Sequence, residues 1–330
     1  MPLFQIGYRR YVGERIPDLL HWLPITRTGL AIAWRSKLLR RVVLASFLPF
    51  LYFGLVFFVI GRVTDPDADP QSPFFEFAQG LLGRPLAEQL HEDPSVVRSA
   101  VWTMVFSTFA TSFQMIIMAL VAAVVGPPLV SNDLRSRAFL IYFSRPISRV
   151  DYVLGKLAIL VCVLSMVTLL PSLLLYVLSI LYSPSMDTLL QTLPVLGSIL
   201  LASTGSLIPV ALFVLMLSSL TRQSRLATIA WFVVCLFGPL THLALGNTPA
   251  LRDSGWTFLL SPLHTLRTFQ LGLYDIEARA GELAVTRGVE DMLEGLTVSE
   301  SPLRAALWLA AVSVGCFLVL LRRVDSPTRV

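Results

Sequence analysis

Charged residues are scarce in this sequence. They make up 14% of the 330 residues, whereas an average soluble chain has roughly 25%. Hydrophobic residues make up 55%, and they come in long runs without charges. A lipid bilayer requires such runs, but a soluble core does not. The composition therefore excludes an ordinary soluble globular protein and predicts an integral membrane protein.

Residues that form disulfides or bind metals are also few. The three cysteines, Cys162, Cys235 and Cys316, fall within apolar runs and have no paired spacing, so we interpret them as small buried hydrophobic residues. The histidines are isolated from one another, and none has the HExxH spacing of a zinc site. They are His21, His91, His242 and His264. The sequence therefore predicts no metal site.

A phosphate-binding loop is missing as well. Gly155-Lys156 looks like the end of such a loop, but Leu157 follows where Ser or Thr is required. Val150 stands where the first glycine of the loop belongs. We therefore expect this chain to have no ATPase site, no catalytic residue and no bound cofactor of its own.

Six uncharged, mostly apolar runs are each near the roughly 20 residues that a helix needs to cross the hydrocarbon layer. They cover residues 42–60, 100–125, 157–182, 193–220, 226–245 and 305–321. The first run begins after a polar, arginine-rich stretch, too late in the chain for a cleaved signal peptide. The sequence therefore predicts an all-α integral membrane fold, in which residues 1–330 form a single transmembrane domain with six transmembrane helices.

Basic residues are unevenly divided between the connecting segments. One alternating set, with 18 Lys and Arg and five acidic residues, comprises residues 1–41, 126–156, 221–225 and 322–330. The other set, with eight basic and 16 acidic residues, comprises residues 61–99, 183–192 and 246–304. The positive-inside rule places the first set, and with it both termini, in the cytoplasm. This distribution explains the net charge of +5 without nucleic-acid binding. The predominance of arginine suggests a GC-rich bacterial genome, and we expect the protein in the bacterial cytoplasmic (inner) membrane.

Two of these segments contain further apolar residues. Near the N-terminus, Leu30, Trp34 and Leu38 share one helical face among basic residues, which predicts an interfacial helix on the anionic cytoplasmic leaflet. A flanking basic segment without that role is the alternative. In the external loop 246–304, the stretch 256–274 is apolar and interrupted by a proline. Two short helices on or in the outer leaflet are expected there.

Uncharged polar residues line up inside the second and third spans, on one helical stripe in each. They are Thr103, Ser107, Thr111 and Gln114 in the second span, and Ser165, Thr168 and Ser172 in the third. Small hydroxylated residues serve helix packing in lipid, and a weakly polar translocation path is the alternative interpretation. None of the six runs has a carboxylate to bind a coupling ion, so the energy for transport is expected to come from another protein.

The cytoplasmic connector between the second and third spans, residues 126–156, is the most informative stretch. Ser131 or Asn132 can cap a short helix that Pro146 ends. The helix would carry Asp133, Leu134, Arg135, Arg137 and Phe139. Its apolar run is too short to cross a membrane, and it suits a helix that lies at the membrane surface or docks into a partner protein.

The end of this connector resembles the signature segment of type 2 ATP-binding-cassette (ABC) exporter permeases. In that family a cytoplasmic helix is followed by the pattern SRPISR…Y…GK. The matching residues here include Arg145, Pro146, Arg149, Tyr152, Gly155 and Lys156. Asp133 stands where many members have glutamate, whereas Arg137-Ala138 departs from their Gly-Thr. The six-span plan, the N-terminal interfacial helix and the long last external loop extend the resemblance over most of the chain.

The resemblance implies a permease subunit that forms the translocation path of an ATP-driven ABC exporter. Two such subunits, identical or homologous, would work in the lipid bilayer with two separate ATPase subunits, which bind the ATP. The short cytoplasmic helix would be the coupling helix, seated in a cleft of the ATPase, and Pro127-Pro128 would stiffen it. An ATP-independent secondary carrier or channel is the alternative. An intramembrane enzyme is a third possibility, for which the spans offer no convincing catalytic pair.

The charge distribution predicts the topology directly. Cysteines introduced at Asp67 and Glu290 should react with a membrane-impermeant thiol reagent on intact spheroplasts, because both positions lie in predicted external loops. A cysteine at Ser136, in the predicted cytoplasmic connector, should react only after the membrane is opened. Labelling of Ser136→Cys on intact spheroplasts would overturn the assignment.

Overall fold

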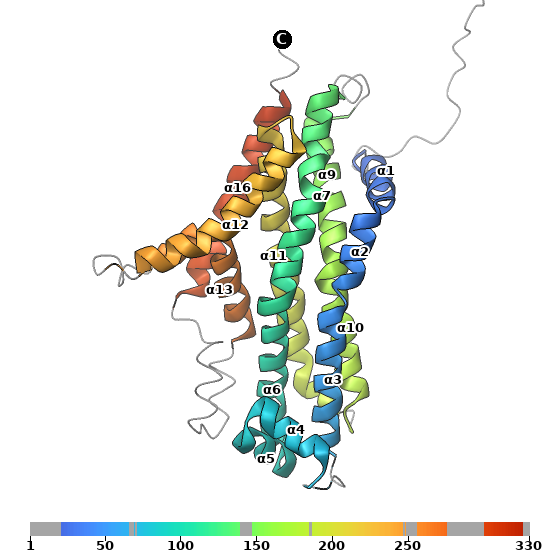
Figure 1. Cartoon of the computed structure of the whole chain (residues 1–330), viewed down its shortest axis with the longest axis vertical. Coiled ribbons are helices and arrows are strands. Elements are labelled where there is room, and N and C mark those ends of the chain that lie inside the picture. The colour runs from blue at the N-terminus through green and yellow to red at the C-terminus, as the bar shows by residue number, and fades with distance from the viewer. Residues whose placement is uncertain are drawn as a thin grey trace, which may run out of the picture.

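The computed structural model describes residues 21–65, 69, 71–138, 147–184, 187–246, 248, 256–275 and 300–325. These residues form helices and the turns between them, without a strand. The long helices run side by side as an elongated bundle, and α12 leans away from its axis (Figure 1). Six helical units are long and apolar enough to cross a membrane, so the predicted number of spans is confirmed. They are Lys37–Val63, Val97–Ser136, Arg149–Leu181, Asp187–Leu220, Ser224–Leu245 and Pro302–Val324.

Three of the spans are built from more than one helical element. The first comprises α2 (Lys37–Ala45) and α3 (Leu48–Val63). The second comprises α6 (Pro94–Thr108), the π-helical turn η2 (Phe109–Gln114) and α7 (Met115–Ser136). The third comprises α9 (Arg149–Val167) and α10 (Leu169–Leu181). The remaining spans are single helices, namely α11 (Asp187–Leu220), α12 (Ser224–Gly246) and α16 (Pro302–Asp325).

The N-terminal segment differs from the expected single interfacial helix. Helix α1 (Leu23–Trp34) ends before Ser36, whose side chain caps α2, so Leu30, Trp34 and Leu38 do not lie on one helix. Instead α1 packs against α9. A Cβ atom built at Gly29 would lie 2.1 Å from Ile159 Cδ1, so a larger residue there would force the Ile159 side chain to move. The apolar spacing of Leu30, Trp34 and Leu38 did not reveal this break, because the N-cap residue Ser36 lies between the second and third of these residues.

The segments between the spans also form helices. Residues 61–99, for which the sequence indicated no helix, contain α4 (Pro73–Leu82) and α5 (Arg84–Glu92). The two short helices expected in 256–274 are present as η3 (Thr257–Leu260) and α13 (Pro262–Tyr274). They pack against α11, α12 and α16. The labelling positions Asp67 and Glu290 lie outside the described residues.

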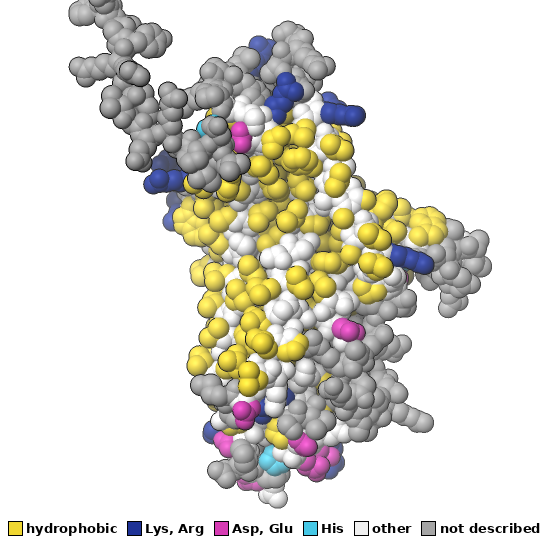
Figure 2. Space-filling model, turned by 180° about the vertical axis from the view of Figure 1, so that it is seen from behind, with side chains coloured by type: hydrophobic (Ala, Val, Ile, Leu, Met, Phe, Trp, Pro, Cys, Tyr) yellow, Lys and Arg dark blue, Asp and Glu magenta, His cyan; other side chains and the backbone are white. Residues whose placement is uncertain are grey.

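Charged side chains gather mainly at the two ends of the molecule, beyond a broad hydrophobic belt (Figure 2). Acidic side chains cluster at the end that carries α4 and α5. At the opposite end, where α7 and α16 finish, most of the charged side chains in view are Lys and Arg. This is the separation expected of a membrane protein that obeys the positive-inside rule.

The polar stripes of the second and third spans meet inside this bundle. Gln114 Nε2 donates to the Thr168 carbonyl oxygen at 2.7 Å, and Ser172 Oγ donates to Gln114 Oε1 at 3.1 Å. Thr168 separates α9 from α10 and has a distorted right-handed helical backbone, with φ −117° and ψ −67°. The side chains of Thr103, Ser107 and Thr111 are also buried, and each hydroxyl bonds to a carbonyl of its own helix. The contacts therefore match the packing interpretation, and the translocation path stays a prediction.

Gln114 provides a test of these two interpretations. Gln114→Met keeps the side-chain volume but removes the hydrogen bonds to Thr168 and Ser172, which should lower the free energy of unfolding by about 1–2 kcal/mol. Ser165→Ala is the matched control, because the half-buried Ser165 donates to the Cys162 carbonyl of its own helix. Unfolding in mixed detergent measures both. Unchanged stability in Gln114→Met, together with altered transport, would favour the path over packing.

Candidate functional site

The second span continues without a break into the connector between the second and third spans. The expected short helix capped by Ser131 or Asn132 is wrong, because both residues lie within α7. The helix ends only at Ser136, and the next residue, Arg137, takes the left-handed conformation at φ 54°. The backbone N–H of Ala138 bonds back to the Asp133 carbonyl at 3.0 Å, which closes the helix end.

Side chains of neighbouring helices keep α7 helical through Pro127-Pro128. Prolines have no N–H to donate and normally break a helix. Ser218 of α11 inserts its hydroxyl here: Oγ accepts from the backbone N–H of Ser131 at 3.0 Å and donates to the Pro127 carbonyl. Thr228 of α12 donates to the carbonyl of Ala123, the residue whose usual partner is the missing Pro127 N–H. The connector end of α7 is therefore fastened to α11 and α12.

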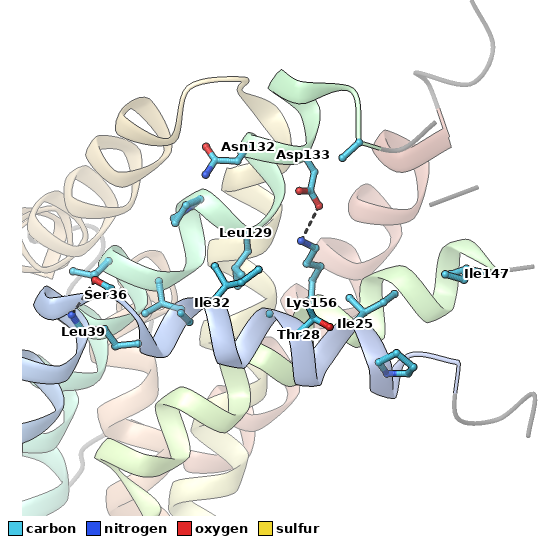
Figure 3. A pocket seen from close by; sticks show the side chains of 17 residues that line it. Ile25, Thr28, Ile32, Ser36, Leu39, Leu129, Asn132, Asp133, Ile147 and Lys156 are labelled. Atoms are coloured by element: carbon cyan, nitrogen blue, oxygen red, sulfur yellow. Dashed lines mark hydrogen bonds and ion pairs between the residues drawn. The ribbon is translucent and has the colours of Figure 1, made fainter. Parts of the chain in front are cut away.

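A largely buried ion pair joins the end of α7 to the start of α9. Lys156 Nζ lies 2.7 Å from Asp133 Oδ2, and the side chains are only 10% and 16% exposed (Figure 3). Tyr152 donates its hydroxyl to the same carboxylate oxygen at 2.7 Å. Asp133 was expected to pair with a partner ATPase, but its carboxylate is directed into this chain. A buried carboxylate needs both a counter-charge and hydrogen bonds, and this cluster supplies both.

The other described residues of the signature segment also act within the chain. Ser148 caps α9 and forms a reciprocal capping box with Asp151. Gly155 lets α1 approach, since a Cβ atom there would lie 2.9 Å from Ile25 Cβ, and the Gly155 carbonyl accepts from Thr26 Oγ1 at 3.2 Å. Arg149 begins α9. Three predicted site residues lie outside the described residues, namely Phe139, Arg145 and Pro146.

A groove of about 680 Å³ opens beside this ion pair, between α1 and α2 on one side and α7 and α9 on the other (Figure 3). Its walls are mostly apolar and include Ile25, Ile32 and Leu129. Asp133 and Lys156 line one part of it. The groove therefore offers an amphipathic surface at the connector end of the bundle.

A second hollow, of about 510 Å³, is strongly basic. Arg135 of α7 lines it together with Arg222 and Arg225, which flank the turn between α11 and α12. Leu134 instead packs toward the core, and Arg137 is exposed. Sequence reasoning placed both connectors on the cytoplasmic side but did not bring Arg135 to Arg222 and Arg225. Arg135 and Arg222 are 87 residues apart in the sequence, so their shared predicted side of the membrane was the one signal that could have related them.

These observations define a multi-pass membrane protein with a basic hollow at the end of its second span, where an ion pair joins that span to the third. Residues 34–321 match the family model described as ABC-2 family transporter protein, and the chain therefore belongs to this family. It is the membrane component of a transporter, of a kind that normally works with an ATPase subunit. A comparison with curated proteins found no match.

The ion pair predicts a non-additive mutant cycle. Asp133→Leu or Lys156→Met alone should destabilise the chain by about 3 kcal/mol, because each removes the counter-charge of a largely buried group. The double variant should recover most of this loss, since the remaining side chains are apolar and of similar size. Unfolding in mixed detergent gives the four stabilities.

The exposed pair Arg84–Glu88 is the control, with 77% and 46% of the two side chains accessible. Its variants Arg84→Gln and Glu88→Gln should show no measurable change, because solvent screens the pair. Additive losses at Asp133 and Lys156 would mean that the two residues contribute independently.

Proposed function

We propose that this chain is the permease subunit of an ATP-driven ABC exporter in a bacterial cytoplasmic membrane. Two copies, or this chain and a homologue, form the translocation path in the lipid bilayer and bind two separate ATPase subunits. ATP is bound by those partners and not by this chain. The main support for the proposal is the match to the ABC-2 family over residues 34–321. The lack of a phosphate loop in the sequence supports the assignment of ATP binding to separate subunits.

The connector would act as the coupling element. Its two ends are joined by the ion pair between Asp133 and Lys156, so a push on residues between them would displace α7 and α9 together. The hydroxyl of Ser218 inserted into α7 would carry part of that displacement to α11. Ordered, well-packed elements of this kind transmit a displacement, whereas a flexible loop would absorb it.

The basic hollow is the proposed electrostatic contact with the ATPase. Arg135, Arg222 and Arg225 concentrate positive charge at the end of the bundle that carries the connector. A partner surface rich in Asp and Glu would complement this charge, raise the rate of association and fix the register of docking. Asp133 takes no part in this contact, because it is paired inside the chain.

Charge reversal in the hollow tests the proposed contact. Arg135→Glu, alone and with Arg222→Glu, should lower recovery of the cognate ATPase in a pull-down, and the loss should shrink at high salt because the contact is ionic. The matched control is Arg322→Glu, an exposed arginine near the same end of the bundle but outside the hollow. Equal recovery by all variants would remove this docking surface. Substrate transport by the chain without any ATPase would instead support the carrier alternative.

A further inference from the structure

Two histidines and a glutamate that are far apart in sequence converge where α12, α13 and α16 meet. His242 lies near the end of α12, His264 in the first turn of α13, and Glu300 two residues before α16. Nε2 of His264 is 3.4 Å and Nε2 of His242 is 3.9 Å from the same Glu300 oxygen, Oε1. One potential ligand atom from each residue lies within 4.8 Å of the other two, and all three side chains are half-buried.

Hydrogen bonding accounts for only part of this arrangement. His264 Nε2 forms a long hydrogen bond to Glu300 Oε1 at 3.4 Å, whereas His242 Nε2, at 3.9 Å from the same oxygen, lies beyond hydrogen-bond distance. The rings of His242 and His264 are also close to each other, with centroids 4.2 Å apart. The two imidazoles and the carboxylate are therefore close enough together that one cation between them could be bound by all three.

We propose that His242, His264 and Glu300 form a binding site for a divalent transition-metal ion of the Zn²⁺ class. Metal–ligand bonds of about 2.0–2.1 Å in a tetrahedral site place the ligand atoms about 3.3 Å apart. The two distances to Glu300, 3.4 Å and 3.9 Å, are near this spacing, and all three ligand atoms lie within 4.8 Å of one another. Two imidazoles and one carboxylate suit Zn²⁺, whereas Ca²⁺ and Mg²⁺ prefer sites made of oxygen ligands.

The surrounding helices hold the ligands in place. Ser261 caps α13 by accepting the His264 backbone N–H at 3.2 Å, which fixes the first turn that carries the His264 side chain. Gly238 of α12 allows this close packing, because a Cβ atom there would lie 3.2 Å from Ser261 Cα. A rigid support of this kind keeps the ligands near the productive geometry before the ion arrives.

The site is separate from the proposed ATPase contact. His242 is 18 residues from Ser224 along α12, a helical distance of about 27 Å, and Ser224 lines the basic hollow. Three protein ligands leave a fourth position open for water or another ligand. A bound ion would fasten the end of the fifth span to α13 and to the start of the sixth, and its binding does not depend on the proposed exporter activity.

Cobalt(II) titration of the purified, tag-free full-length chain in detergent tests this site, because tetrahedral Co²⁺ absorbs visible light and Zn²⁺ displaces it. We expect one Co²⁺ per chain. Glu300→Gln and His264→Gln should weaken binding by at least about a hundredfold, since loss of an outer-sphere partner alone costs 10–100-fold. The control His91→Gln removes a histidine outside the cluster, hydrogen-bonded to the Val63 carbonyl, and should leave binding unchanged.

Glu300→Cys distinguishes ligation from a fold defect. A thiolate ligand in place of the carboxylate should keep Co²⁺ bound and add an intense sulfur-to-cobalt charge-transfer band in the near ultraviolet, which only direct coordination produces. Absence of visible absorption in the wild-type chain, or binding that His264→Gln and Glu300→Gln leave unchanged, would overturn the proposal. So would a Glu300→Cys chain that binds Co²⁺ without the new band.

Discussion

The hydrocarbon layer offers no hydrogen-bond partners, so each interruption of a backbone ladder within a span must be satisfied by the protein itself. Two interruptions illustrate this. At Pro127-Pro128 in the second span, Thr228 donates to the Ala123 carbonyl, which lacks its usual N–H partner, and Ser218 bonds to the Ser131 N–H and the Pro127 carbonyl. At the break between α9 and α10 in the third span, Gln114 donates to the Thr168 carbonyl, which also accepts from the Ser172 N–H. Each compensating side chain comes from a neighbouring span, so each repair also fixes the position of one helix against another. Polar residues in lipid thereby specify helix packing as well as backbone satisfaction.

The residues of the signature segment at the connector end of the bundle likewise form contacts within the chain. A sequence pattern shared with a transporter family invites the interpretation that its residues touch the partner. The described residues act inward instead: Tyr152 and Lys156 hold Asp133, and Gly155 admits α1. The pattern therefore marks the scaffold that presents the connector. In the proposed complex, contact with the ATPase would be left to exposed side chains such as Arg135.

The spans were predictable because charge-free runs of sufficient length have few structural solutions in a membrane protein. The continuation of α7 was not, because Ser131 resembles a helix cap and the tandem prolines resemble a break. The compensating Ser218 lies 87 residues away from Ser131. The pairing of Asp133 with Lys156 was not predictable from a local sequence pattern either, because it depends on how α9 packs against α7 after the connector. The histidine–glutamate cluster was missed for the same reason: its members are isolated in sequence, and only the packing of α12 against α13 brings the two histidines together.

The pattern of fastening points decides which helices would move together under the proposed coupling. Helix α7 is joined to α9 by the ion pair, to α11 by Ser218, and to α12 by Thr228 and by Trp231, whose Nε1 donates to the Ala119 carbonyl at 2.9 Å. Displacing α7 alone would break all of these contacts, and the hydrogen bonds within the hydrocarbon layer would find no replacement partners there. Under the proposed coupling, a push on the connector would therefore be borne by four helices as one unit. We expect the first span to accommodate the movement at the break between α2 and α3, where the Phe47 N–H bonds to the Leu44 carbonyl three residues back. The second to fifth spans would deliver the movement.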